Sequence, residues 1–433
     1  MRDKVIREAE YVTLPGGPRA GQVSVPSSKS QLHRLLICAT LGERPVEICY
    51  KGLSEDIRAT ANCLNALGAK VETEEAEDGS WGRLLVTPVD RTKPAHGAVL
   101  HCGESGTTLR FLLPVVGMLG TTCLFIRAGR LPERPLAPFD EQLRIHGMTL
   151  DGEGSHLTVS GALRSGEYAL PGNISSQYVS GLLMAFSGLA GPSRLRVEGR
   201  LESSKYIEMT EAVLRQSGIV FSKNVTSTET VWTMDGGQTP ALPKQVTAEG
   251  DWSAAVNFLC MGALSAEGVL VQGLNPDSVQ PDKAILEVLH RIGATVEWRE
   301  QGVFVRKGKL QAIEFDASQN PDVVPALAAL LSLCEGTSRI YHAERLRLKE
   351  SDRIKSTVHL LRSLSGIVTE TADGLLIQGR PFLDGGTADP SGDHRIAMAA
   401  AVAACGCKRP VQVLTPRCVA KSYPRFWDDL EQL

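Results

Sequence analysis

SKSQLHRLLICATL, residues 28–41, is the first of six apolar segments that open on a polar phrase and recur along the chain. The other five are ESGTTLRFLLPVVGML (104–119), SSQYVSGLLMAFSGLA (175–190), DWSAAVNFLCMGAL (251–264), PDVVPALAALLSL (321–333) and DHRIAMAAAVAAC (393–405). Their starts, taken at Ser30, Gly106, Ser175, Asp251, Asp322 and Asp393, lie 76, 69, 76, 71 and 71 residues apart. A nearly fixed period indicates one structural unit that is repeated.

A second series of helices accompanies the first. These helices are amphipathic and end in a glycine before a strand, as in CLNALGAKVE and LEVLHRIGATVEW. The glycines are residues 68, 147, 218, 293 and 366, and a second strand-like phrase such as RLLVTP or VFVRKG follows each one. The sequence therefore predicts an α/β fold of α+β repeats, in which two helices and a strand pair recur with a period of about 70 residues.

The sixth repeat is cut short, because RFWDDLEQL reaches the end of the sequence without its glycine or strands. The N-terminal phrases EYVTLP and GQVSVP could supply the missing hairpin, and Pro240 and Pro243 suit a crossover linker. We therefore predict two similar domains of three repeats. One is discontinuous (1–25 and 249–433), the other is inserted (26–248), and the active site is expected in the cleft between them.

Composition excludes several classes of protein. Apolar residues make up 42% of the chain without a membrane-length run, and the formal net charge of -3 gives no electrostatic footprint for nucleic acid or membrane. The segment MRDKVIREAEYV resembles no targeting peptide, and the ten scattered cysteines indicate free thiols in a reducing compartment. We expect a cytoplasmic globular enzyme that requires neither a metal nor a cofactor.

The polar starts of the apolar helices are candidate anion sites, because a helix N-terminus offers unpaired N–H groups and a positive dipole end. They carry Lys29, Ser30 and Arg34, then Gly106, Thr107 and Arg110, then Ser175, Ser176 and Gln177, and finally His394 and Arg395. The alternative is that the serines and aspartates, Asp322 among them, only cap helices and that the arginines are solvated.

Further charged phrases lie between the helices. They contain Arg134, then Lys349, Glu350 and Arg353, and finally Lys421. Arginine suits bidentate contacts to carboxylate or phosphate, whereas KESDR taken alone has the pattern of a solvated helix face.

These phrases occur in the order that is typical of one family. SKSQLHR, ESGTTLR, the ERP loop, NISSQYVSGLLMA, NPD, RLRLKESDRI, GDHRIAMA and AKSYPRFWDDL resemble the EPSP synthases (3-phosphoshikimate 1-carboxyvinyltransferases) over nearly the whole chain. The resemblance implies two domains, each of three βαβαββ repeats in an inside-out α/β barrel. It also implies an enzyme that transfers the enolpyruvyl group of phosphoenolpyruvate to shikimate 3-phosphate and that is a target of glyphosate.

The resemblance also implies roles for particular residues. Asp322 would be the base, Glu350 would handle the proton at the enolpyruvyl methylene carbon, and Lys29 would lie between both ligands. Shikimate 3-phosphate would contact Lys29, Ser30, Arg34, Ser175, Ser176, Gln177, Ser203, Asp322 and Lys349. Phosphoenolpyruvate would contact Lys29, Gly106, Arg134, Gln177, Arg353, Arg395 and Lys421. The resemblance supports a ligand contact less strongly for Thr107, Arg110, Tyr206, Arg345 and His394.

Two departures from the family pattern affect the donor and acceptor sites. Relatives often carry asparagine or a similar residue where this chain has Arg345, and Phe111 follows the donor loop. Two alternatives to this activity stay open: the sister transferase that acts on UDP-N-acetylglucosamine, and a noncatalytic protein that binds phosphorylated metabolites. We expect a monomer whose partners are the two small-molecule substrates.

Overall fold

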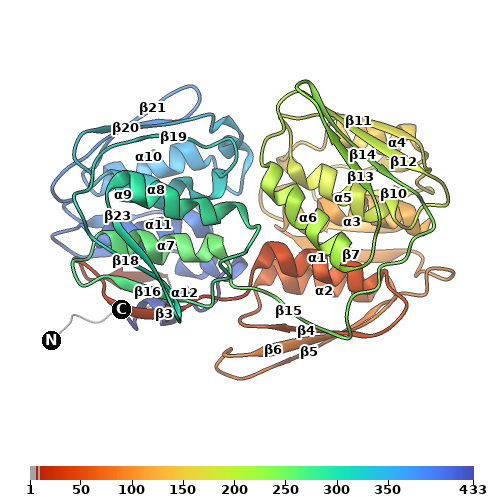
Figure 1. Ribbon diagram of the computed structural model, residues 1–433, viewed down its shortest axis with the longest axis horizontal. Helices are drawn as coiled ribbons and strands as arrows, with labels where there is room; N and C mark the ends of the chain where they lie inside the picture. The colour runs from red at the N-terminus through yellow and green to blue at the C-terminus, as the bar shows by residue number, and fades with distance from the viewer. Residues whose placement is uncertain (1–5, 8–9) are drawn as a thin grey trace. The chain divides into compact units, whose positions relative to one another are not determined.

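The computed structural model describes residues 6–7 and 10–433, and it divides the chain into two compact domains (Figure 1). The discontinuous domain comprises residues 1–28 and 249–433, and the inserted domain comprises residues 29–248. The chain first passes from the discontinuous domain to the inserted domain after Ser28, whereas the sequence placed this boundary after residue 25. Ser28 belongs to the discontinuous domain because its amide donates to the Glu249 carbonyl at 2.7 Å.

The inserted domain contains three repeats. The first is β15 (Gln245–Thr247), α1 (Lys29–Thr40), β4 (Val46–Tyr50), α2 (Glu55–Ala66), β5 (Lys70–Glu75) and β6 (Gly82–Thr87). The second is β7 (Ala98–Gly103), α3 (Gly106–Leu119), β8 (Cys123–Arg127), η1 (Leu131–Glu133), α4 (Phe139–Ile145), β9 (Thr149–Asp151) and β10 (His156–Ser160). The third is β11 (Glu167–Pro171), α5 (Ser176–Phe186), β12 (Ser193–Glu198), α6 (Ser204–Gln216), β13 (Ser222–Val225) and β14 (Glu229–Met234).

The discontinuous domain contains the other three. The fourth repeat is β3 (Gly21–Ser24), α7 (Trp252–Ala263), β16 (Val269–Gln272), η2 (Pro281–Ala284), α8 (Ile285–Ile292), β17 (Thr295–Arg299) and β18 (Gly302–Arg306). The fifth is β19 (Glu314–Asp316), η3 (Pro321–Val323), α9 (Val324–Leu331), β20 (Thr337–Tyr341), η4 (Glu344–Leu348), α10 (Arg353–Ser363), β21 (Ile367–Glu370) and β22 (Leu375–Gln378). The sixth is β23 (Gly386–Ala388), α11 (His394–Ala404), β24 (Val411–Leu414), η5 (Pro416–Lys421), α12 (Phe426–Leu430), β1 (Ile6–Arg7) and β2 (Tyr11–Leu14).

Each repeat forms one four-stranded sheet. The order β11-β12-β14-β13 is representative: the first two strands are parallel, and the other two join antiparallel. None of the six sheets closes on itself within the described part of the chain. The predicted βαβαββ repeat is therefore present six times, as six separate open sheets.

The N-terminal strands complete two different sheets, so the hairpin predicted from EYVTLP and GQVSVP is wrong. β2 pairs antiparallel with β24 in the sixth repeat, where β1 is its hairpin partner. β3 instead pairs in parallel with β16 of the fourth repeat. Residues 15–20 connect the two strands and include Pro15 and Pro18, which lack a backbone N–H donor and therefore disfavour a tight hairpin between them.

The apolar helices of the repeats form the centre of each core. In the discontinuous domain α7, α9 and α11 pack against one another, and every residue of α9 is buried. In the inserted domain α3 packs against α5, and Phe111 and Phe186 are fully buried. Among the described residues, no helix is both long and apolar enough to span a membrane.

Candidate active site

Arg34 on α1 is held rigidly inside the inserted domain. Its side chain is 3% exposed and donates to Thr210 Oγ1 at 2.7 Å, to the Tyr206 carbonyl at 2.8 Å and to the Ser30 carbonyl at 2.6 Å. Burial lowers the pKa of Arg34 to about 10, so the guanidinium stays charged at neutral pH. The interpretation of this arginine as a solvated surface residue is therefore wrong.

The start of α1 is tied to α2. Lys29 Nζ donates to Asp56 Oδ2 at 2.9 Å, and both side chains are mostly buried. Ser30 lies half-buried in the same first turn. Asp56 had no distinguishing signal in the sequence beyond its place in the first turn of an amphipathic helix.

Gly106 lies against two guanidinium groups. A Cβ built on this residue would be 2.7 Å from Arg110 Nη1 and 3.0 Å from Arg134 Nη1. The predicted candidates Gly106, Arg110 and Arg134 are thus brought together at the start of α3. Ser105 caps that helix, because its side chain accepts from the Thr108 amide.

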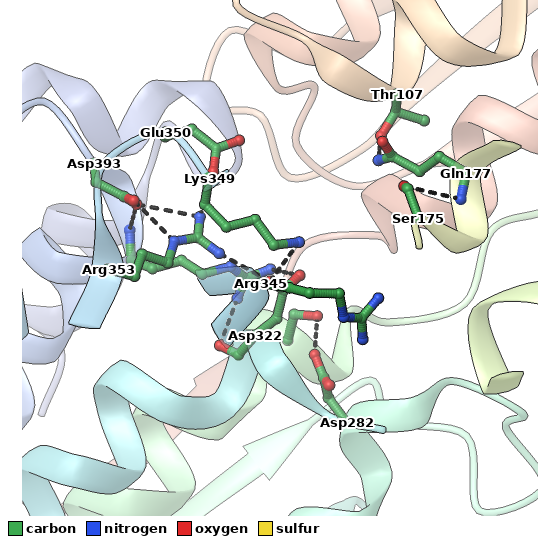
Figure 2. A network of polar contacts seen from close by, with 12 residues as sticks. Thr107, Ser175, Gln177, Asp282, Asp322, Arg345, Lys349, Glu350, Arg353 and Asp393 are labelled. Atoms are coloured by element: carbon green, nitrogen blue, oxygen red, sulfur yellow. Dashed lines mark hydrogen bonds and ion pairs between the residues drawn. The ribbon is translucent and has the colours of Figure 1, made fainter. Parts of the chain in front are cut away.

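The starts of α3 and α5 are joined by one amide side chain (Figure 2). Gln177 Nε2 donates to Thr107 Oγ1 at 2.8 Å. Gln177 Oε1 accepts from Arg110 Nη1 at 2.9 Å. Ser175 caps α5 by accepting from the Gln177 amide, and Ser176 is the first residue of that helix. The cap role predicted for Ser175 is therefore confirmed, and Gln177 in the same helix also contacts the start of α3.

Ser203, another of the predicted ligand contacts, lies directly before α6. It is buried and has a left-handed backbone with φ of 53°, which serine rarely adopts. Tyr206 lies one turn later and contributes its carbonyl to Arg34. The helix α6, which begins after Ser203, packs against α1 within this domain.

Asp322 in the discontinuous domain lies at the centre of a second cluster of charges. It belongs to the short 3-10 helix η3 and caps no helix, since α9 begins only at Val324. Its Oδ1 accepts from Arg353 Nη1 at 2.9 Å, its Oδ2 accepts from Arg395 Nη2 at 2.8 Å, and Lys349 Nζ lies 3.9 Å from Oδ1. The cap interpretation of Asp322 is therefore wrong.

Arg353 connects Asp322 to two further carboxylates, as Figure 2 shows. It donates to Glu350 Oε2 at 2.7 Å and to Asp393 Oδ2 at 2.8 Å, and its side chain is 2% exposed. Lys421 Nζ lies 3.7 Å from Glu350 Oε1. KESDR is thus no solvated face, although Asp352 within it caps α10 by accepting from the Lys355 amide. We call Asp322, Lys349, Glu350, Arg353, Asp393, Arg395 and Lys421 the ion cluster.

The ion cluster strongly favours the charged state of Asp322. Burial alone would raise the pKa of Asp322, but Arg395, Lys349 and Arg353 together hold it well below its usual range. For Arg353 the carboxylates Asp393, Glu350 and Asp322 outweigh burial and raise the pKa. Asp322 is therefore an available but weak proton acceptor while all three cations face it.

The remaining predicted residues lie at the edge of the ion cluster. Arg345 donates to the Ser318 carbonyl at 3.0 Å, and His394 Nδ1 lies 3.6 Å from Asp393 Oδ1. Asp393 is an additional member that the sequence marked only as a helix start. It caps α11 through the Arg395 amide while accepting from Arg353.

Comparison with known proteins relates this geometry to a family. The sequence model of EPSP synthase (3-phosphoshikimate 1-carboxyvinyltransferase) matches residues 14–430. The 3-phosphoshikimate 1-carboxyvinyltransferase of Clostridium kluyveri is 38% identical over 98% of this chain and 97% of its own length. That of Clostridium acetobutylicum is 37% identical over 95% of each chain.

Solved structures agree with the sequence relatives. The EPSP synthase of Acinetobacter baumannii superposes with a TM-score of 0.75 and 25% identity over 97% of both chains. The enolpyruvyl transferase NikO of Streptomyces tendae, with a TM-score of 0.76 and 17% identity over 98% of this chain and 97% of its own, shares the fold. With its six βαβαββ repeats and the family match over nearly its whole length, the chain belongs to the EPSP synthase (3-phosphoshikimate 1-carboxyvinyltransferase) family.

Proposed function

We propose that this chain transfers the enolpyruvyl group of phosphoenolpyruvate to the 5-hydroxyl of shikimate 3-phosphate and releases phosphate. The 5-oxygen attacks C2 of phosphoenolpyruvate while C3 gains a proton, and the tetrahedral adduct then loses phosphate and a proton from C3. Both steps require groups that accept and donate protons at fixed positions. The family membership and the ion cluster support this reaction.

In this proposal the two carboxylates of the ion cluster divide the proton transfers. Asp322 accepts the proton of the attacking hydroxyl, and Glu350 exchanges a proton with C3. Arg353 donates to both carboxylates, which fixes their mutual position. Fixed geometry of this kind lowers the cost of orienting the reacting groups.

The cations of both domains neutralise the substrates in this proposal. Arg34 holds the 3-phosphate of shikimate 3-phosphate, together with Lys29, Ser30, Ser175, Ser176, Gln177 and Ser203, while Asp322 and Lys349 hold its hydroxyls. Gly106, Arg134, Arg353, Arg395 and Lys421 bind phosphoenolpyruvate with Lys29 and Gln177. The active site thus uses residues of both domains, as we infer from the family resemblance.

The observation that carries the proposal is the position of Asp322 among Arg353, Arg395 and Lys349. When anionic substrate groups bind these cations, they reduce the positive field at Asp322 and thereby raise its proton affinity. The base would then become effective only after the donor substrate is bound. A buried ion cluster with several cations is suited to following this redistribution of charge.

An assay of phosphate release from phosphoenolpyruvate tests the proposal. We expect turnover with shikimate 3-phosphate and none with UDP-N-acetylglucosamine as the acceptor. Turnover with the second acceptor alone would assign the chain to the sister activity. Binding of both ligands without phosphate release would make it a noncatalytic homologue. Cytoplasmic location and a monomeric state remain predictions of composition and resemblance.

A further inference from the structure

Asp282 is a buried carboxyl group that the reaction as described does not use. It lies in η2 and is 0% exposed. Its Oδ2 accepts a short hydrogen bond from Ser253 Oγ on α7, whereas Oδ1 is buried without a hydrogen-bond partner among the described residues. A buried carboxylate with an unsatisfied oxygen destabilises a folded protein. Such a residue in a core calls for an explanation beyond stability.

The surroundings of Asp282 connect it to the ion cluster. Asn320 Nδ2, two residues before Asp322, donates to the Pro281 carbonyl at 2.6 Å and so ties η2 to η3. Figure 2 shows the Asp282 side chain directed toward the group around Asp322. The charged groups that act on Asp282 are Asp322 on η3, Arg395 on α11 and Asp251 at the start of α7.

Charge repulsion between the two carboxylates is mutual. Burial and then the negative charge of Asp322 raise the pKa of Asp282 to about 6, against the lowering influence of Arg395 and Ser253. The same repulsion raises the proton affinity of Asp322. Arg395, Lys349 and Arg353 nevertheless hold the pKa of Asp322 well below its usual range, so Asp282 adjusts the proton affinity of the base without setting its charge state.

We propose that Asp282 is a positioning residue for the reaction, whose buried negative charge opposes Arg395 and keeps Asp322 basic enough to accept the substrate proton. This inference rests on the proposed function, since it assigns Asp282 a task only if Asp322 is the base. Its charge is present above about pH 6 and absent below. The enzyme would therefore lose kcat on acidification through this pH even though Asp322 itself stays ionised.

The test is Asp282→Asn, which nearly preserves shape and keeps an acceptor for Ser253. At pH 8 and saturating substrates we expect kcat to fall roughly three- to tenfold, as a like charge is removed beside the base. The KM for phosphoenolpyruvate should stay equal or decrease, because Arg395 loses a competing anion. The part of the fall in kcat around pH 6 that Asp282 causes should disappear, which leaves only the smaller change that the substrate phosphates impose as they titrate there.

Thermal unfolding separates this role from a purely structural one. The pKa of Asp282 is raised in the folded state, so its contribution to stability is present at low pH and is lost as the pH rises through about 6. The Tm of Asp282→Asn relative to the unmodified chain should therefore increase between pH 5 and pH 8. A structural role would instead lower the Tm and kcat together at both pH values.

Two further variants complete the experiment. Ser253→Ala removes a hydrogen bond that lowers the pKa of Asp282. The fall in kcat on acidification, which we call the acid limb, should therefore move to higher pH, while kcat at pH 8 changes little. Asp429→Asn alters another buried carboxyl of the same domain, bonded to Tyr423, and should leave the acid limb in place.

The outcomes distinguish the inference from the proposed function. If the unmodified chain releases no phosphate with shikimate 3-phosphate, the proposed function fails. If it is active and Asp282→Asn keeps both kcat and the acid limb, only the role of Asp282 is overturned.

Discussion

Arg353 contacts Asp322, Glu350 and Asp393 through a single guanidinium, and this arrangement leads to a prediction for the two reacting carboxylates. Asp322→Asn and Glu350→Gln remove a titratable group while nearly preserving shape. We expect each to lower kcat at least about 100-fold, the usual contribution of a general acid or base. Ligand affinity, measured by calorimetry, should change far less. Near-normal turnover in either variant would refute the role of that residue.

Gly106 gives a second prediction at the scale of one residue. An alanine methyl would come within 2.7 Å of Arg110 Nη1 and 3.0 Å of Arg134 Nη1, so both flexible side chains must shift. We expect Gly106→Ala to raise the KM for phosphoenolpyruvate and to weaken glyphosate, the longer occupant, by a larger factor of roughly ten to a hundred. The measurements are that KM and the glyphosate inhibition constant. Equal changes in both, or a lower Tm with no change in either, would contradict the placement of Gly106 at the donor pocket.

Single residues also show where sequence reasoning reached its limit. The charged candidates were identifiable because Arg34, Arg353 and Asp322 stand in distinctive phrases. Pattern alone nevertheless favoured a cap for Asp322 and a solvated face for KESDR, because local spacing does not reveal burial by distant segments. Asp282 had no signal at all, since an aspartate after proline is typical of an ordinary turn or helix start.

Strand β2 provides a prediction at the scale of an element. Leu14 is 0% exposed and lies opposite Val411 of β24, although nearly 400 residues separate the two strands. We expect Leu14→Ala to lower the free energy of unfolding by about 2 to 5 kcal/mol, as for other buried leucines. Urea denaturation measures this change. The control Val220→Ala, at a side chain that is 74% exposed, should have little effect, and an equal effect of both variants would exclude a core role for β2.

Elements were predictable to the extent that their signals are local. The apolar helices and the glycines that end the amphipathic ones follow from periodicity, and α3 begins at Gly106 as the repeat predicts. Partners of edge strands depend on contacts distant in sequence, which periodicity does not encode. β3 was accordingly placed in a hairpin, whereas it pairs with β16.

The division of the proposed ligand contacts between two domains gives a prediction for the whole molecule. Shikimate 3-phosphate contacts Arg34 of one domain and Lys349 of the other in our proposal, so its binding should favour the arrangement that also binds phosphoenolpyruvate. We expect it to tighten a phosphoenolpyruvate analogue by a factor of about 5 to 150, the usual range of coupling between sites. Calorimetry with and without shikimate 3-phosphate measures the factor. Unphosphorylated shikimate should couple less, and equal analogue affinity under all conditions would disprove the coupling.

The exchange of strands between distant parts of the chain has a consequence for synthesis on the ribosome. β2 ends at Leu14, but its partner β24 begins at Val411 and is therefore made nearly 400 residues later. At a synthesis rate of about 5 to 20 residues per second, the apolar side chains of β2 remain without that partner for roughly 20 to 80 s. The whole inserted domain, residues 29–248, emerges during this interval and can fold as one continuous segment. The nascent chain thus exposes an unpaired apolar strand while the inserted domain folds. A chaperone that binds the strand during this period would protect the chain from aggregation.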